Sequence, residues 1–310
     1  MNADLDALAT ALYVTIDDLL LANPDLLPER PAVGIAPLLS DAELLTMAVL
    51  QALLGFANEA RWIRHARRHL TAMFPYIPAR SGYNKRLREA TSMMSGVMRM
   101  IAMRCASRHD DLWLIDSTPV ECGRSRETAK RSDLVGWAGY GYCASHSRYF
   151  WGLRLHLIAT PSGLPIAFAL SDPKIDEREI ARDLLDFELA LLARHGGQTL
   201  MADKGYRSKE LDSFMADLGI ELIRPATKAE PERPGQRFLK PFRQVIESVN
   251  QTLKAQLDLE RHGARTSAGV VARVLQRLLA LTAAIWHNET TNRPVLRSLT
   301  AFDHQRRAWN

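Results

Sequence analysis

The feature that most constrains the fold is a change, near residue 110, in the spacing of the apolar residues. Before it, apolar residues recur at helical period, as in SDAELLTMAVLQALLGF at 40–56. After it, short apolar runs typical of strands alternate with amphipathic helical segments. The chain is therefore predicted to combine an all-α N-terminal region with an α/β region.

The order of elements after residue 110 narrows the topology. Three consecutive strands can form a meander, and the later strand–helix–strand units require parallel neighbours joined by right-handed crossovers. We predict a mixed five-stranded sheet flanked by helices, with a long loop at 123–149. The predicted strands are 112–122, 150–160, 166–171, 198–203 and 220–225, and the predicted helices are 176–197, 208–219, 238–259 and 268–287.

Length and composition exclude several classes of protein. The chain has 310 residues, of which 47% are hydrophobic and 24% charged, as in an ordinary globular protein of about two domains. No apolar run approaches the roughly 18 residues that cross a bilayer, and the N-terminus is acidic where a secretory signal is basic. Three unclustered cysteines support neither a disulfide framework nor a zinc site. We expect a cytoplasmic protein without a membrane partner.

The charge is divided sharply along the N-terminal region. Residues 1–59 contain nine acidic side chains and one basic, whereas residues 60–108 contain eleven basic and one acidic. Such a basic block is typical of proteins that bind a nucleic-acid backbone. The alternatives are that the two halves neutralise each other or that the arginines cover a solvated surface. The candidate DNA contacts are Arg61, Arg64 and Arg68 on one helical face, and Lys85, Arg86 and Arg88 on the next basic helix.

Two aspartates follow apolar runs of strand type. Asp116 comes after Leu112–Ile115, and Asp203 comes after Leu200–Ala202. Ligands of open α/β sheets bind at the carboxyl ends of the strands, where we expect both carboxylates to lie. The alternative is that each aspartate only caps a turn.

A third acid lies on the helix at 238–259. Arg243, Glu247, Asn250 and Lys254 share one helical stripe, opposite an apolar face. The stripe is either solvated, with weak pairs between neighbouring turns, or directed at a site in which Glu247 joins the two aspartates.

Three carboxylates on separate elements suit Mg²⁺, with Mn²⁺ as a substitute, because hard cations prefer oxygen ligands. Two ions about 4 Å apart would activate the attacking oxygen and neutralise the leaving oxygen of a phosphoryl displacement. Asp116 is the natural bridging ligand, and Asp203 and Glu247 would each complete the shell of one ion. Arg243 and Lys254 would then contact DNA phosphates.

Further basic and polar side chains are candidates for DNA binding. Lys204 and Tyr206 follow Asp203 directly, and Asn250 belongs to the stripe of Glu247. Arg124, Arg126 and Lys130 lie in the predicted loop at 123–149, where they could follow the DNA backbone or remain solvated.

Four stretches of the chain resemble bacterial insertion-sequence transposases of the DDE class, and most closely the insertion-sequence 982 family. They are WLIDSTPVECGR, WAGYGYCASHSRYFWGLRLHLIAT, MADKGYRS and FRQVIESVNQTLK. The resemblance implies a ribonuclease-H-like core with Asp116, Asp203 and Glu247 as its catalytic triad. Related transposases carry an arginine, a glutamate four residues on and a lysine seven further, a spacing that Arg243, Glu247 and Lys254 match. Some relatives begin this signature with a tyrosine, where this chain has Lys240.

The resemblance also implies an activity, which is cleavage at the terminal inverted repeats of an element and joining of the 3′-hydroxyl ends to target DNA. It implies a homodimer in the synaptic complex and a bacterial, nucleoid-associated location. Residues 1–108 would bind element ends, 109–290 would form the catalytic domain, and 291–310 would be a tail. The alternatives are a metal-dependent nuclease without strand transfer and a non-catalytic DNA-binding descendant of a transposase.

Overall fold

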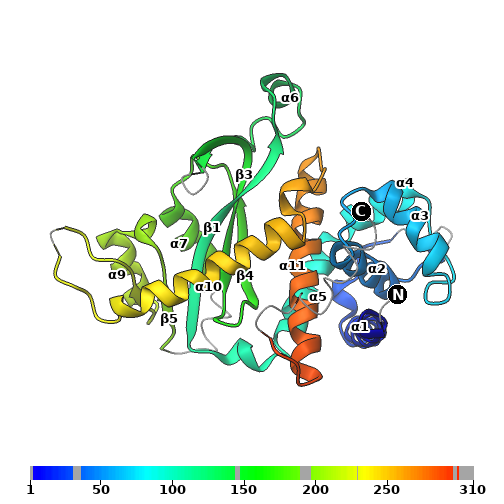
Figure 1. Ribbon diagram of the computed structural model, residues 1–310, viewed down its shortest axis with the longest axis horizontal. Helices are drawn as coiled ribbons and strands as arrows, with labels where there is room; N and C mark the ends of the chain where they lie inside the picture. Colours follow the sequence, from blue (N-terminus) through cyan, green and yellow to red (C-terminus); the bar gives the residue numbers. More distant parts are fainter. Residues whose placement is uncertain are drawn as a thin grey trace. The chain divides into compact units, whose positions relative to one another are not determined.

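The chain folds into two compact units in the computed structural model (Figure 1). Unit 1 combines residues 1–104 with 253–310, and unit 2 is residues 105–252. The structure describes residues 3–30, 36–143, 147–188, 197–228, 230–295 and 299. Most of the predicted tail at 291–310 thus lies outside the described residues.

Unit 2 is built on a mixed sheet of six strands. Their order is β2-β3-β1-β5-β6, with β4 paired to β3. The first four strands pair antiparallel, whereas β5 pairs parallel with both β1 and β6. The strands are β1 Leu112–Gly123, β2 Gly139–Cys143, β3 Arg148–Ala159, β4 Pro165–Ser171, β5 Thr199–Met201 and β6 Glu221–Ile223.

The predicted α/β class and all five predicted strands are confirmed. The segment at 123–149, predicted as a long loop, instead contains helix α6 (Arg126–Lys130) and the sixth strand β2. Strand β2 escapes a pattern-based prediction because its buried positions include glycines. A Cβ at Gly141 would lie 2.5 Å from the Pro173 Cβ, so packing there excludes the larger side chains that usually mark a strand.

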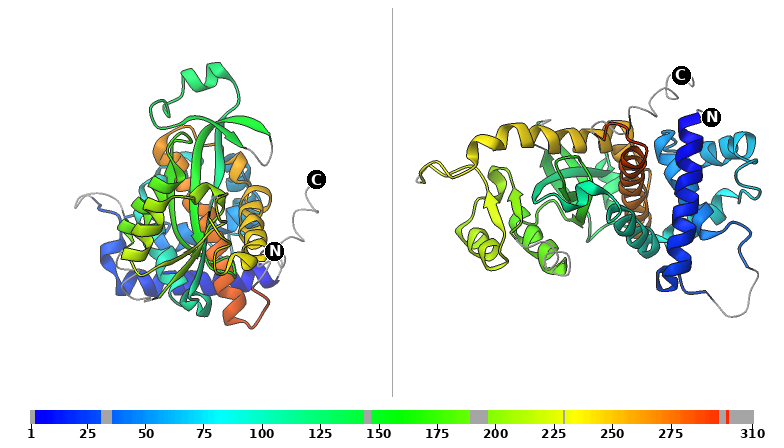
Figure 2. Two further views of the ribbon diagram at one scale, coloured as in Figure 1. Left: turned by 90° about the vertical axis from the view of Figure 1, so that its left-hand side faces the viewer. Right: turned by 90° about the horizontal axis from the view of Figure 1, so that it is seen from below.

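Helices cover both faces of the sheet. Helix α10 (Leu239–Gln251) crosses one face, while α7 (Glu177–Phe187) and α9 (Lys209–Asp217) cover the other (Figure 2). Helix α10 was predicted to continue to residue 259, but it passes into a π-helical turn at Thr252–Gln256. The predicted second half of α7 falls on residues 189–196, which lie outside the described residues.

Unit 1 is all-helical and is organised around its last helix. Helix α11 (Ser267–Thr290) packs against α1, α2, α4 and α5. The predicted catalytic domain at 109–290 includes α11, which belongs to unit 1 in the structure, where neighbouring helices bury its largely apolar surface. The other helices are α1 Ala3–Ala22, α2 Asp41–Leu53, α3 Glu59–His69, α4 Arg80–Glu89 and α5 Thr91–Ala102.

Local signals account for several helix ends in unit 1. Helix α2 begins with the capping box expected from the sequence, in which Ser40 and Glu43 each bond the backbone N–H of the other. The basic helix expected to carry Lys85, Arg86 and Arg88 is α4, and α5 follows it after a break at Ala90. Helix α11 is the one described helix long and apolar enough to cross a membrane, but 83% of its apolar window is buried inside the protein. It is therefore the core helix of unit 1.

Candidate active site

Three acidic side chains from three separate elements line one cavity of unit 2. The cavity has a volume of about 500 Å³ and is bounded by β1, the end of β5, and α10. Its acidic lining is Asp116, Asp203 and Glu247. The sequence prediction that these three segments approach one another thus has a counterpart in the fold.

Asp116 lies at the point where β1 and β5 separate. The two strands pair in parallel from Leu112 to Leu114 of β1, and no pair follows among the described residues. The predicted strand at 112–122 is confirmed as β1, but Asp116 lies within this strand, opposite Leu157 of β3, and not at its carboxyl end as expected. The carboxylate is therefore held on a rigid strand beside the opening left by β5.

Asp203 begins the short turn that follows β5. It is the N-cap of a 3-10 turn at Lys204–Tyr206, and its Oδ1 accepts a hydrogen bond from the Gly205 N–H at 2.6 Å. Asp203 thus caps a turn, as the alternative interpretation expected, but it uses only one of its two carboxylate oxygens to do so. A Cβ at Gly205 would lie 2.6 Å from Oε2 of Glu177, so the close approach of that carboxylate requires glycine at this position.

The electrostatic environment of Asp116 opposes its ionisation. Burial, assisted by the nearby carboxylates of Asp203 and Glu177, raises the pKa of Asp116 to about 7. Two donors oppose this effect, the backbone N–H of Ser117 and Nδ2 of Asn250, which lies 2.8 Å from Oδ2 of Asp116. The cluster is thus rich in negative charge and short of cations, a condition common at functional sites.

Glu177 is a fourth acid of this cluster, and the sequence prediction missed it. It is the first residue of α7, directly after the N-cap Asp176. Its Oε1 accepts a hydrogen bond from the Ser117 hydroxyl at 2.6 Å and forms an ion pair with Arg154 of β3. Its place immediately after the strand–turn that ends β4 was the available signal, but an acid in the first turn of a helix is also favoured by the helix dipole alone.

Glu247 lies on the exposed side of α10. Its Oε1 pairs with Nε of Arg243 at 3.1 Å, and both side chains are more than half exposed, at 57% and 55%. Among the described residues, no three His, Cys, Asp or Glu side chains are close enough to hold one ion together. Glu247 therefore shares the cavity with the two aspartates without joining them in a three-acid cluster.

Asn250 connects α10 to the acidic cluster. Its side chain is buried, donates to Asp116, and leaves its own Oδ1 without a partner in the described part of the chain. Lys254, predicted on the same stripe, lies in the π-helical turn after α10, and this turn changes the angular spacing of the residues that follow.

The donor set fits divalent ions that are each held by two carboxylates. Mg²⁺ is commonly bound by one or two carboxylates and completes its shell with water and substrate oxygens, so no ion needs all three acids. Asp116 and Asp203 are mutually close carboxylates with no cationic side chain paired to either among the described residues. The unpartnered Oδ1 of Asn250 beside them is a further oxygen that can accept a hydrogen bond.

The predicted DNA contacts of unit 2 have unequal exposure. Lys204 is exposed, whereas Tyr206 is buried, and burial raises the pKa of its phenol well above the ordinary value. Arg124, Arg126 and Lys130 line a separate cleft of about 950 Å³, together with the rings of Tyr140, Tyr149, Phe150 and Trp151.

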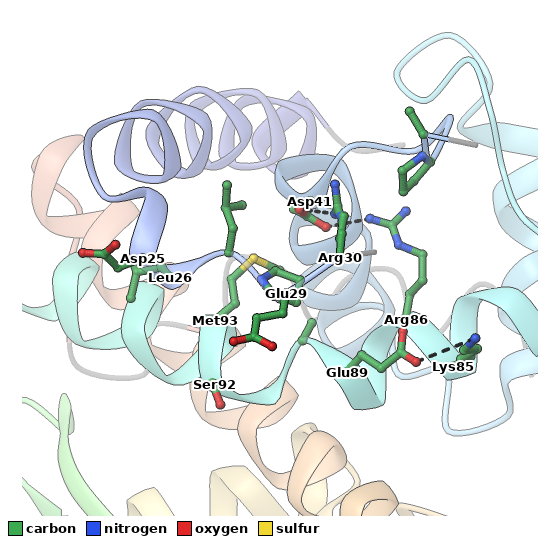
Figure 3. Close-up of a pocket in the computed structure, with 15 residues that line it drawn as sticks. Asp25, Leu26, Glu29, Arg30, Asp41, Lys85, Arg86, Glu89, Ser92 and Met93 are labelled. Carbon is green, nitrogen blue, oxygen red and sulfur yellow. Dashed lines mark hydrogen bonds and ion pairs between the residues drawn. The ribbon is translucent and has the colours of Figure 1, made fainter. Parts of the chain in front are cut away.

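The predicted contacts of unit 1 also divide into two groups. Arg61, Arg64 and Arg68 are exposed on α3, as expected. On α4, Arg86 is directed inward, where it bonds Asp41 at 2.7 Å next to Arg30, and Lys85 faces Glu89 at 3.9 Å (Figure 3). The alternative that the acidic and basic halves neutralise each other therefore holds for Arg86.

Comparison with known proteins identifies a family. Residues 107–283 match the sequence model of a family described as the transposase DDE domain. The matched region includes Asp116, Asp203 and Glu247 and covers more than half of the chain. A search of curated proteins gives no match.

Proposed function

The chain belongs to the family of transposase DDE domains, and from this premise we propose that it cleaves DNA at the terminal inverted repeats of an insertion sequence and joins the 3′-hydroxyl ends to target DNA. We assign it to the insertion-sequence 982 family on the sequence stretches quoted above. The observation that carries the proposal is the shared cavity of Asp116, Asp203 and Glu247. Each comes from a different element, as a site for two metal ions requires.

In this proposal two Mg²⁺ ions, with Mn²⁺ as a substitute, are held by the three acids. When bound, they supply charge neutralisation on the scissile phosphate and activation of the attacking oxygen. Asp116 would contribute to both positions, while Asn250 and the Ser117 N–H fix the orientation of its carboxylate. Glu247 would hold an ion only after leaving its exposed pair with Arg243, an exchange that would cost little because exposed ion pairs contribute about 0–1 kcal/mol.

Glu177 has a distinct role in the proposed chemistry. It pairs with Arg154, a guanidinium of the same cluster, which pairs with neither aspartate among the described residues. An arginine that paired directly with Asp116 would compete with a metal ion for the same oxygens. Glu177 therefore acts as a positioning residue that keeps the aspartates free for cations.

The proposed DNA contacts follow from the exposed basic side chains. Arg243, freed when Glu247 turns to the metal, and Lys204 would bind phosphates beside the scissile bond. The cleft of Arg124, Arg126 and Lys130 combines cations with exposed aromatic rings, a combination suited to a distorted DNA end. The remaining proposed contacts are Lys254, Arg61, Arg64, Arg68, Lys85 and Arg88.

The site of action and the assembly state complete the proposal. A protein of this kind would work in the bacterial cytoplasm, at the nucleoid. Because two element ends must be cut and joined together, the active assembly would be at least a homodimer on DNA.

The proposal is tested with DNA that flanks the coding sequence, incubated with the full chain and Mg²⁺. We expect cleaved ends and joined products, both abolished by replacing Asp116, Asp203 or Glu247 singly with Ala. Asp217, exposed at the end of α9, supplies the matched control Asp217→Ala. Retained cleavage in any one of the three variants would remove that residue from the triad.

The same assay separates the rival functions. Cleaved DNA without joined product would indicate a nuclease that lacks strand transfer. DNA binding without any metal-dependent cleavage would indicate a non-catalytic descendant.

A further inference from the structure

Unit 1 contains a cavity of about 680 Å³ that the proposed chemistry does not use. Its walls are the start of α3, one face of α4, and the loop and first turns of α11. A single carboxylate, Glu59, is present in the lining. We call it the basic cavity because five arginines line it, namely Arg80, Arg88, Arg261, Arg265 and Arg273.

The one carboxylate of the basic cavity is already neutralised. Glu59 forms an ion pair with Arg273, which is 7% exposed, and also accepts a hydrogen bond from Nδ2 of Asn84 at 2.7 Å. No carboxylate pairs with any of the other four arginines in the part of the chain that the structure describes. The cavity therefore keeps a concentrated positive charge that its own lining does not compensate.

A fixed loop presents two of these arginines. Between Arg261 and Arg265, the buried His262 accepts a hydrogen bond from the Ala264 N–H at 3.1 Å, and Gly263 takes the left-handed conformation with φ 68°. The neighbouring arginines are both exposed on either side of this anchor. The loop thus brings two like charges close together, and an anionic ligand would reduce their mutual repulsion.

The beginnings of two helices add to the positive potential. Asn58 caps α3 and Thr266 caps α11, and both residues line the basic cavity. Backbone N–H groups in the first turn of a helix favour an anion, and guanidinium forks match the oxygens of a phosphate. The lining contains no Phe, Tyr or Trp that could stack on a base. A phosphodiester backbone therefore suits the cavity better than a free nucleotide does.

We propose that the basic cavity binds the phosphodiester backbone of double-stranded DNA, independently of base sequence. This inference rests on the proposed function, because it assigns a DNA contact to unit 1 that is separate from the exposed face of α3. The principal DNA contact of unit 1 is then made by residues 261–273 and α4. This binding does not require cleavage of the DNA.

The test measures the affinity of the full chain for a fluorescein-labelled 30-base-pair duplex. Binding is monitored by fluorescence anisotropy in EDTA, at NaCl concentrations between 50 and 200 mM. We expect R261Q/R265Q to bind at least tenfold more weakly. The slope of log affinity against log salt should also fall by about 2, because each lost phosphate contact removes about 0.9. R261K/R265K should keep most of the slope with intermediate affinity, since charge is retained and the guanidinium fork is lost.

The matched control is R99Q/R104Q, which removes two exposed arginines of unit 1 that do not line the cavity. Equal affinities and slopes for the two double variants would overturn the inference while leaving DNA binding by the chain established. A wild-type chain that does not bind the duplex would overturn both the inference and the proposed function. Calorimetric binding of inorganic pyrophosphate, with duplex affinity unchanged in R261Q/R265Q, would instead assign the cavity to a small anion.

Discussion

Replacing Asp116 with Asn should stabilise the apoprotein at pH 8. The pKa of Asp116 rises from 3.8 to about 7 on folding, so its ionisation opposes the folded state. At 1.36 kcal/mol for each pKa unit, the penalty is about 4 kcal/mol above pH 7 and vanishes below about pH 4. The amide loses this penalty, and its oxygen can still accept the hydrogen bond from Asn250. An enzyme that maintains such a penalty trades stability for a site.

The sign of the pH dependence makes the prediction specific. Between pH 4 and 7 the folded state binds more protons than the unfolded state, so the free energy of unfolding of the wild type falls as pH rises. D116N should lack this fall, and the difference between the two proteins should grow by about 2–4 kcal/mol from pH 4 to pH 8. The free energy of unfolding of unit 2 is measured by urea titration in EDTA, with hydrogen exchange of peptides from β1 as the signal.

Two controls complete this experiment. D217N makes the same chemical change at an exposed position and should alter stability by less than about 0.5 kcal/mol at either pH. Mg²⁺ should raise the stability of the wild type at pH 8 and leave D116N unchanged, because an ion that binds only the folded state stabilises it. A variant that is no more stable than the wild type at pH 8 would refute the assignment of Asp116 as a desolvated carboxylate.

Three further predictions follow from the packing and charges of unit 2. Glu177→Gln removes a carboxylate that raises the pKa of Asp116, so the pH midpoint of Mg²⁺-dependent cleavage should move to lower pH, and an unchanged or higher midpoint would contradict this. Gly152→Ala would place a Cβ 2.1 Å from a carbonyl oxygen of β1 and should cost more than about 3 kcal/mol by urea denaturation, whereas Gly82→Ala in the open part of α4 should be neutral or slightly stabilising. Arg224→Met removes a guanidinium only 1% exposed that pairs with Asp212 and Glu230, both of which keep a second partner in Arg233. A lower free energy of unfolding is expected in the same assay, and an unchanged value would contradict a structural role for this pair.

The sheet and its two aspartates were predictable because the relevant signals are local. A short apolar run followed by a carboxylate marks Asp116 and Asp203 within a few residues of sequence. The place of Asp116 within β1 was not predictable in this way. Strand β1 continues through the polar residues and Pro119 that follow Asp116 because β3 pairs with it from Leu114 to Gly123. Beyond Leu114 its other edge is unpaired by β5, and an edge can accommodate a proline.

Contacts between distant segments were beyond the reach of the sequence. Glu177 is 60 residues from Ser117, and no periodic pattern links the first turn of α7 to the middle of β1. The basic block at 60–108 shows the same limit. From the composition we expected Arg86 to be available for DNA, but in the structure it pairs with Asp41 of the acidic block.

The distribution of charge in unit 1 can be explained by asking which arginines the fold neutralises. Those that reach the acidic residues of the first sixty positions, such as Arg86 and Arg273, form ion pairs inside the unit. Arg261 and Arg265 come from a segment beyond the α/β region and line the basic cavity, and no carboxylate pairs with either of them among the described residues. The basic cavity therefore forms where residues 261–273 pack against α3 and α4. A count of charges along the chain does not find it, because such a count assigns the positive charge to residues 60–108 alone.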